Sequence, residues 1–205
     1  MKPDYWDRAK RALGRRDPVM GRIMREHPKV FLARRGEPFL TLARAIVGQQ
    51  ISVKAAQSVW DRLVACVGDV APHTVLAKDR KLLRACGLSD RKTEYIADLA
   101  QHFADSAIHV QRWPEMADEE IIAELVEVRG IGRWTAEMFL IFNLLRPDVF
   151  PLDDLGLQKG IRLAYFKGRK VSLRTMQRVG EAWRPWRSVA TWYLWRSLDP
   201  LPVEY

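Results

Sequence analysis

The chain has 205 residues, of which 48% are hydrophobic and 29% charged, so it can bury a core and lacks the composition of a disordered protein. No apolar run is long enough to cross a bilayer, and the N-terminal residues lack the apolar stretch of a signal peptide, so we expect a cytoplasmic protein without membrane contact. The net charge of +9 favours a polyanionic partner.

Apolar residues recur at helical spacing along almost the whole chain, and period-two alternation is nearly absent. The predicted helical segments, in chain order, are 38–66 in two parts, 79–86, a segment starting near residue 89, a segment starting near residue 118, 133–145, a segment after residue 154, and 186–198. Short helices with short breaks predict an all-α fold with no substantial sheet.

Residues that prefer helix ends mark several of these boundaries. The predicted N-caps are Ser52, Ser89 or Asp90, Asp118 and Asp153. Gly87 is expected just beyond a helix C-terminus, Pro147 is expected to stop the 133–145 helix, and Pro185 fits the first turn of the last helix. Pro72 and the Trp113-Pro114 region are the weak points for a boundary between lobes.

The positive charge is concentrated at the two ends of the chain. Residues 1–36 hold 11 Lys and Arg against 4 Asp and Glu, residues 37–155 hold 13 against 18, and residues 156–205 hold 10 against 3. An ordinary basic surface is the simpler interpretation. Two basic ends around an acidic middle also suit a groove that faces phosphates, if the ends meet in the fold.

Few residues suit a metal or a nucleotide cofactor. Cys66 and Cys86 are the only cysteines, too few for a four-thiolate cluster, and the four histidines are scattered without metal-ligand spacing. The sequence contains neither GxxxxGK[ST] nor GxGxxG. We therefore expect no required cofactor and no iron–sulfur cluster.

Residues 125–136, LVEVRGIGRWTA, place a glycine turn between two stretches of helical spacing. Gly130 and Gly132 permit positive φ and close backbone approach, and the helix that resumes after them opens with free N–H groups. Such a helix start can bind a phosphate. The residues expected to form this phosphate site are Gly130, Gly132, Arg133 and Thr135. An ordinary tight turn between helices is the alternative.

These motifs together resemble a known family. LVEVRGIGRWTAEMFLIF followed by DVFPLDDLGLQKGI is similar to the helix-hairpin-helix DNA glycosylase superfamily, whose signature is the hairpin, a Gly/Pro-rich segment and an aspartate. LARAIVGQQISVKAA resembles its early core helix and DNA-inserting loop, and RPWRSVATWYLW its closing helix. Within the superfamily the 3-methyladenine DNA glycosylase II type matches best. The extra N-terminal α/β domain of longer members is not expected.

The resemblance implies an all-α fold of two helical lobes with a DNA-binding cleft that contains the hairpin. We expect a central lobe over about 38–110 or 38–145 and a second lobe from 1–37 with 146–205. The implied activity is that of a monomeric, monofunctional DNA glycosylase in base excision repair. It would flip and excise bases of the 3-methyladenine and 7-methylguanine class from double-stranded DNA and leave an abasic site.

The motif places Asp154 at the catalytic position. Breaking an N-glycosidic bond builds positive charge on the sugar, and a nearby carboxylate stabilises that charge and can orient or deprotonate water. Asp153 and Asp154 could instead be solvated surface acids, or one could be only a helix N-cap. Members that also nick DNA carry a lysine nucleophile where this chain has Trp134, so no lyase activity is expected.

The resemblance also implies pocket, wedge and cation-binding residues. The expected base pocket contains Trp134, Trp195, Met138 and, more weakly, Tyr193, although at least two of the four C-terminal tryptophans should fill the core. Gln50, with Gln49, would fill the gap left by the flipped nucleotide, and Ser52 and Lys54 would contact phosphates. Main-chain carbonyls of Val126, Val128 and Gly130 would hold Na⁺ or K⁺.

The sequence leaves three alternatives to this enzyme open. A non-catalytic protein could use the hairpin only as a phosphate clamp, but a clamp needs neither Asp154 nor an aromatic C-terminal helix. A helix-turn-helix regulator would need a basic, polar recognition helix, whereas TAEMFLIFNLL is apolar and acidic. A glycosylase for another lesion, such as uracil, mismatched thymine or oxidised guanine, differs only in the shape of its pocket.

Overall fold

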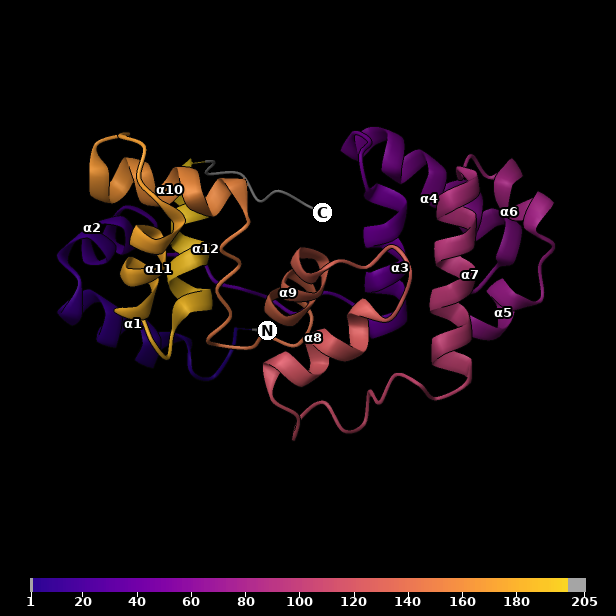
Figure 1. The fold of residues 1–205 in the computed structure, drawn as a ribbon, viewed down its shortest axis with the longest axis horizontal. Helices are drawn as coiled ribbons and strands as arrows, with labels where there is room; N and C mark the ends of the chain where they lie inside the picture. Colours follow the sequence, from indigo (N-terminus) through magenta and orange to yellow (C-terminus); the bar gives the residue numbers. More distant parts are fainter. Residues whose placement is uncertain (1, 199–205) are drawn as a thin grey trace. The chain divides into compact units, whose positions relative to one another are not determined.

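The computed structural model describes residues 2–198 and contains twelve α-helices and no strand over that range (Figure 1). The prediction of an all-α fold is confirmed. The chain divides into two compact units, which we call unit 1 and unit 2. Among the described residues, unit 1 contains 2–34 and 140–198, and unit 2 contains 35–139. No helix in the described range is long and apolar enough to span a membrane.

Unit 1 is built from both ends of the chain around the last helix. Its helices are α1 (Trp6–Arg16), α2 (Pro18–Glu26), α10 (Leu155–Phe166), α11 (Leu173–Glu181) and α12 (Arg187–Leu198). Helix α12 packs against α1, α2 and α10. It has no distinct polar face, and most of its side chains are buried, including Ser188, Thr191 and Arg196, as expected for a helix enclosed by others.

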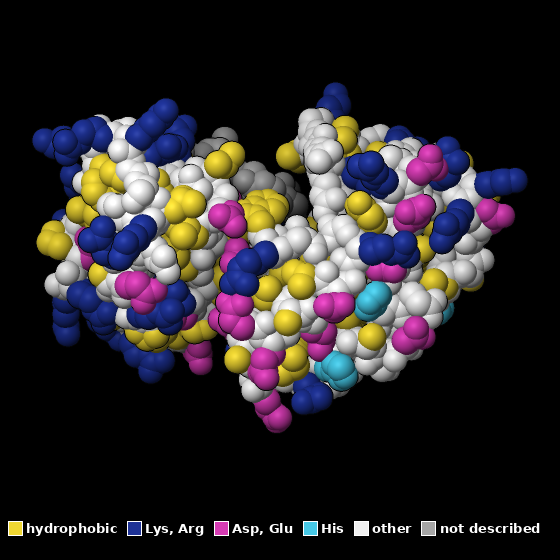
Figure 2. Space-filling model, in the orientation of Figure 1, with side chains coloured by type: hydrophobic (Ala, Val, Ile, Leu, Met, Phe, Trp, Pro, Cys, Tyr) yellow, Lys and Arg dark blue, Asp and Glu magenta, His cyan; other side chains and the backbone are white. Residues whose placement is uncertain are grey.

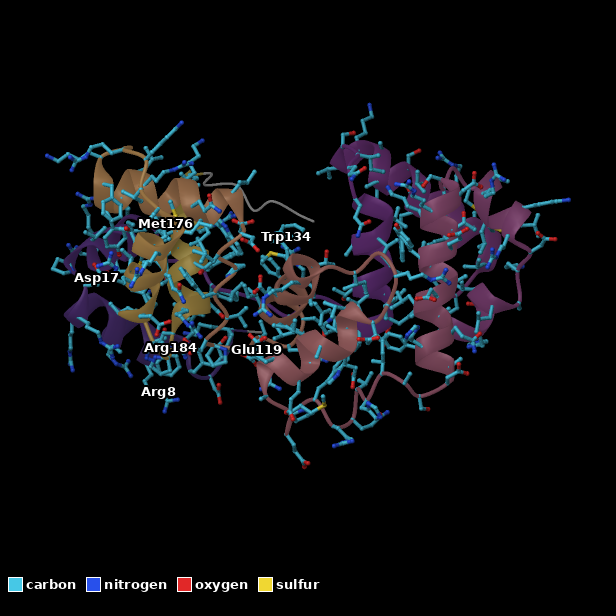
Figure 3. The ribbon with its side chains drawn as sticks, viewed as in Figure 1. Arg8, Asp17, Glu119, Trp134, Met176 and Arg184 are labelled. Carbon is cyan, nitrogen blue, oxygen red and sulfur yellow. The ribbon has the colours of Figure 1, made fainter. Side chains whose placement is uncertain are left out.

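Asp17 joins three parts of unit 1 at the junction of α1 and α2 (Figure 3). Its Oδ1 accepts the backbone N–H groups of Val19 and Met20, at 2.9 and 3.1 Å, and caps α2. Its Oδ2 accepts the Tyr165 hydroxyl at 2.6 Å and the Trp183 Nε1–H at 3.1 Å. Burial, followed by the bond to Asp17, raises the pKa of Tyr165, so this phenol stays protonated and donates.

Unit 2 contains α3 (Pro38–Gly48), α4 (Val53–Val67), α5 (Pro72–Leu76), α6 (Arg80–Ala85), α7 (Asp90–Ala104), α8 (Asp118–Val126) and most of α9 (Arg133–Phe142). Helix α3 packs on α4 and α7, and α5 and α6 pack on α7. The apolar stripe predicted for 38–66 supplies buried residues of α3 and α4, with Ser52 capping α4 through its Oγ and the Ala55 N–H.

Several predicted helix ends are confirmed and others are corrected. Ser89 caps α7, and Gly87 follows the end of α6 with φ +95°. The N-cap of α8 is Ala117 rather than Asp118, and α9 ends at Phe142, before the predicted residue 145. Pro185 lies two residues before α12, outside its first turn. The N-cap of α10 is Asp154 rather than Asp153.

Candidate active site

The glycine turn between α8 and α9 forms the hairpin that the sequence predicts. Gly130 has φ +87°, and an added Cβ would overlap the ring of Tyr95, so a side chain is excluded there. Gly132 does not have a positive φ, and a Cβ there would point into open space, so no steric constraint requires glycine at this position. Gly132 is exposed at the start of α9. Buried Leu125, Val128 and Ile131 hold the two helices together beneath the turn.

Two side chains from elsewhere in unit 2 fix this turn. Asp98 of α7 accepts the Arg129 backbone N–H at 2.9 Å and the Arg129 Nε–H at 3.0 Å. Gln49 donates its Nε2–H to the Gly130 carbonyl at 2.8 Å. The hairpin is therefore anchored both to α7 and to the loop after α3.

Arg133 begins α9 with its guanidinium already engaged by carboxylates. It donates to both oxygens of Glu119, at 2.9 and 2.6 Å, and to Glu137 at 3.1 Å. These bonds raise the pKa of Arg133 further above its usual value, with the Glu119 bond as the largest cause. Two acids beside one cation do not favour a further phosphate, so a phosphate contact by Arg133 stays a prediction that this geometry does not support.

Two of the three carbonyls predicted to hold a monovalent cation already accept a hydrogen bond in the hairpin. The Gly130 carbonyl accepts Gln49 Nε2–H, and the Val128 carbonyl accepts the Ile131 N–H at 3.1 Å. A carbonyl oxygen has two lone pairs, so the cation site at Val126, Val128 and Gly130 stays a prediction. Among the described residues, no cluster of three or more His, Cys, Asp or Glu side chains suits a metal ion.

One face of α9 presents aromatic and thioether surface. The Trp134 side chain is 38% exposed and projects from α9 (Figure 3), so it is not a core residue of unit 2. Met138 lies one turn further along the helix and is half-buried, as is Thr135. Trp134 and Met138 can therefore share one face of α9, as a base pocket requires.

The GQQIS loop between α3 and α4 is held in one conformation. Gln50 adopts φ +58°, which is uncommon for a residue with a side chain, and it is exposed. Lys92 of α7 donates its Nζ to the carbonyls of Val47 and Gln49, both at 2.7 Å, and burial lowers the pKa of this lysine. Gln49 is occupied by the hairpin, so Gln50 is the exposed member of the predicted wedge pair.

The two predicted phosphate contacts beyond this loop lie at the start of α4. Ser52 uses its Oγ as the N-cap acceptor and still has a hydroxyl proton to donate. Lys54 is exposed and lines a shallow groove along α4 with Gln57 and Asp61. Both positions remain predictions.

Asp154 stands at the N-terminus of α10 in unit 1. Its Oδ1 accepts the Leu157 N–H at 2.6 Å and the Trp195 Nε1–H at 2.8 Å. Two donors on one oxygen fix the orientation of the carboxylate. The side chain is half-buried, whereas the neighbouring Asp153 is exposed.

Trp195 is held in place by its neighbours in unit 1. Its indole stacks on Phe142 with ring centroids 5.7 Å apart and an interplanar angle of 15°. A Cβ on Gly156 would lie 3.1 Å from Asp154 Oδ1 and 3.3 Å from the Trp195 ring, so glycine permits this close approach. Trp195 therefore contacts the candidate catalytic carboxylate directly, in addition to its predicted place in the base pocket.

Tyr193 does not fit the predicted pocket. Its side chain is fully buried, tilts against Trp6 at 5.9 Å and donates its hydroxyl to the Val30 carbonyl at 3.3 Å. It belongs to the core of unit 1. The expectation that at least two C-terminal tryptophans fill the core is confirmed, because Trp183, Trp186 and Trp192 are buried.

Sequence reasoning missed the residues that support these groups. Phe142 and Gly156 flank Trp195, and Asp98 and Lys92 anchor the hairpin and the inserting loop. Gly156, two residues after Asp154, is the one position whose residue type could have indicated these contacts. Glycine is rare within a helix unless something packs closely against it.

With this geometry in place, comparison with known proteins defines the class. Residues 43–185 match the HhH-GPD superfamily base excision DNA repair proteins, and the chain belongs to this superfamily. DNA-3-methyladenine glycosylase 1 of Schizosaccharomyces pombe is 34% identical over 78% of this chain and 72% of its own length. The match to a Bacillus subtilis relative, 32% identical over 86% of this chain, spans only 64% of that protein.

Two solved structures share the fold. The crystal structure of a DNA-3-methyladenine glycosidase from Bacillus halodurans has a TM-score of 0.85 and 31% identity, and the match covers 92% of this chain and 87% of that one. A 3-methyladenine DNA glycosylase of Schizosaccharomyces pombe in complex with abasic DNA has a TM-score of 0.81 and 30% identity, with 97% and 99% coverage.

Proposed function

We propose that the chain is a monofunctional DNA glycosylase that flips alkylated bases out of duplex DNA and hydrolyses their N-glycosidic bonds. Its substrates are bases of the 3-methyladenine and 7-methylguanine class, and its product is an abasic site for base excision repair. It acts on DNA in the cytoplasm. It acts as a monomer, because one chain supplies both the hairpin and the carboxylate. Membership of the superfamily and the names of its relatives support this proposal.

The observation that carries the proposal is the fixed carboxylate of Asp154. As the bond between base and sugar lengthens, positive charge develops on the sugar, and an oriented carboxylate stabilises it. The same group can orient or deprotonate the attacking water. The two donors on Oδ1, Leu157 N–H and Trp195 Nε1–H, hold the carboxylate before substrate arrives, so no reorganisation is needed in the transition state.

The hairpin and α9 supply binding rather than chemistry. The exposed start of α9 after Gly132 offers backbone N–H groups to a phosphate, and the exposed ring of Trp134 can stack on a cationic alkylated base. The chain has Trp134 where strand-nicking members carry lysine. Its indole cannot form a Schiff base with the sugar, so strand breaks should appear only after alkali treatment.

The Asp154→Asn variant tests the proposal. Asparagine caps a helix about as well as aspartate, so the fold and DNA binding should be retained. Release of 3-methyladenine and 7-methylguanine from methylated duplex DNA, followed by chromatography, should fall below detection. Asp153→Asn is the matched control, since this neighbour is exposed and does not cap α10, and it should keep wild-type release. Near wild-type release by Asp154→Asn would refute the assignment.

A further inference from the structure

The segment that follows Asp154 contains several basic residues and no acidic one. From Leu155 to Gly180 the sequence contains seven Lys and Arg and no Asp or Glu. We call these seven residues the α10–α11 basic surface; they are Lys159, Arg162, Lys167, Arg169, Lys170, Arg174 and Arg178. They lie on α10, on α11 and on the turn between them, all within unit 1. Figure 2 shows Lys and Arg side chains gathered over α10.

The cations of this surface are not neutralised by the protein. Six are exposed and Arg162 is half-buried, and within the described range none of the seven forms an ion pair. Arg169 donates its Nε–H only to the Phe166 carbonyl, at 3.3 Å. In the same unit Arg184 and Arg187 both pair with Asp148, so only some arginines of unit 1 are neutralised by an acid. Clustered like charges repel one another, and a polyanion relieves that repulsion.

The length and position of the surface indicate duplex DNA rather than an isolated phosphate. Helix α10 starts at Leu155, directly after Asp154. Its twelve residues extend about 18 Å at ~1.5 Å per residue, which is the rise of about five base pairs of DNA. A strand whose damaged nucleotide lies at Asp154 therefore has several phosphates within the length of this helix.

The apolar side of α10 is already used, which argues against a membrane as the partner. Leu157 and Ile161 are fully buried, and α10 packs on α12. Leu163 is exposed but lies 3.8 Å from the position of a Cβ on Gly168, next to the turn. A helix that inserts into a bilayer surface needs its apolar face free, whereas the buried face of α10 is packed within unit 1 and its exposed side chains are Leu155, Lys159 and Leu163.

We propose that the α10–α11 basic surface binds the phosphate backbone of undamaged duplex DNA beside the lesion. The contacts are to backbone phosphates and are independent of sequence, so they hold the enzyme on DNA while it searches and leave base recognition to the site at Asp154. The inference rests on the proposed function only in taking DNA as the substrate.

A fourfold variant with Lys167, Arg169, Lys170 and Arg174 changed to alanine tests this surface. The association constant for an undamaged duplex of about 30 base pairs should fall at least tenfold or so at roughly 0.1 M salt. The slope of log K against log salt should decrease in magnitude by about 0.9 for each phosphate that the variant no longer neutralises. Single-turnover base release at saturating enzyme should stay at the wild-type rate, because these residues take no part in the chemistry.

The control removes four exposed cations from α1 and α2 of the same unit. Its substitutions are Arg11→Ala, Arg15→Ala, Arg22→Ala and Arg25→Ala, and it should keep the wild-type salt slope. Equal losses in both variants would reduce the effect to net charge and overturn the proposal, as would an unchanged slope in the first variant. Loss of binding to anionic phospholipid vesicles without loss of DNA binding would assign the surface to a membrane instead.

Asp154→Asn separates this inference from the proposed function. It should abolish base release and keep the wild-type salt slope. If Asp154→Asn retained base release while the fourfold variant still showed a smaller salt slope of DNA binding, the catalytic assignment would fail and the DNA-binding surface would stand.

Discussion

Asp154 combines a helix cap with the proposed catalytic role in one carboxylate. The Oδ1 atom caps α10 through Leu157 N–H and also accepts the Trp195 Nε1–H. The motif alone identified Asp154 as the catalytic candidate, but it assigned the cap to Asp153. Both aspartates precede the helix and have equal intrinsic preference for its N-terminus, so only the backbone path decides which side chain turns back onto the first N–H groups.

Trp195→Phe should lower kcat about tenfold or more with little change in KM, because it removes a hydrogen bond to a charged group while keeping a ring to stack on Phe142. Initial rates of base release measured across substrate concentrations give both constants. The matched control is Trp192→Phe, since the buried Trp192 Nε1 has no hydrogen-bond partner in the described structure. Unchanged kcat in Trp195→Phe would show that the indole N–H does not position Asp154.

At the scale of elements, the hairpin shows what local sequence can and cannot predict. The spacing of Leu125, Val128 and Ala136 around two glycines is local, and it predicted the two helices and their turn. The anchors come from Gln49 and Asp98, which lie 81 and 31 residues from their partners. No periodicity links such distant positions, so their contacts appear only in the folded structure.

Gly130→Ala should destabilise the hairpin by about 1–3 kcal/mol, because it forces a side chain into positive φ and against Tyr95. Thermal or urea unfolding measures this change. Gly132→Ala is the control, with open space around its Cβ, and its stability should stay within about 0.5 kcal/mol of wild type. Equal stability of the two variants would contradict the role assigned to Gly130.

Asp98 should make the stability of the hairpin depend on acid pH. Burial alone would raise the pKa of Asp98, but the backbone and side-chain bonds from Arg129, with a smaller contribution from His102, lower it below its usual value. A depressed pKa in the folded state contributes stability above the unfolded pKa of about 3.9, and this stability is lost as pH falls through the folded value.

Asp98→Asn should therefore cost about 1–3 kcal/mol in urea unfolding at neutral pH, and the difference from wild type should shrink below about pH 4. Asp69→Asn serves as the control, because the Asp69 carboxyl is exposed and forms no hydrogen bond or ion pair with the described residues. The difference in stability between this variant and wild type should not change with pH. A difference that stays constant down to pH 2 or so would rule out titration of Asp98 as its source.

At the scale of the whole molecule, unit 1 depends on segments from opposite ends of the chain. Trp6, Leu13 and Met20 of α1 and α2 are fully buried, and both helices pack on α12. The superfamily match begins only at residue 43, so these helices complete a core that the shared motif does not contain. The sequence predicted the positive charge of this region but no helix before residue 38. It also did not predict the buried ring contact of Trp6 with Tyr193, because that contact joins residues nearly two hundred positions apart.

Removal of residues 1–34 should abolish base release by exposing the core of unit 1, although the deleted segment contains no candidate site residue. Limited proteolysis should then cut within 140–198 faster than in the full chain, since the remaining helices lose the surface that covers them. A truncated chain that resists protease and releases base at the wild-type rate would contradict this dependence.

The same two-ended construction sets an order of events during translation. Residues 35–139 are continuous, so they can begin to fold while the ribosome is still at work. Helices α1 and α2 are made before unit 2 and their partner α12 after it, so the amphipathic α1–α2 segment must wait until α12 has been synthesised. During that interval its apolar stripe is available to chaperones, and a nascent chain stalled before α12 is the species most exposed to aggregation.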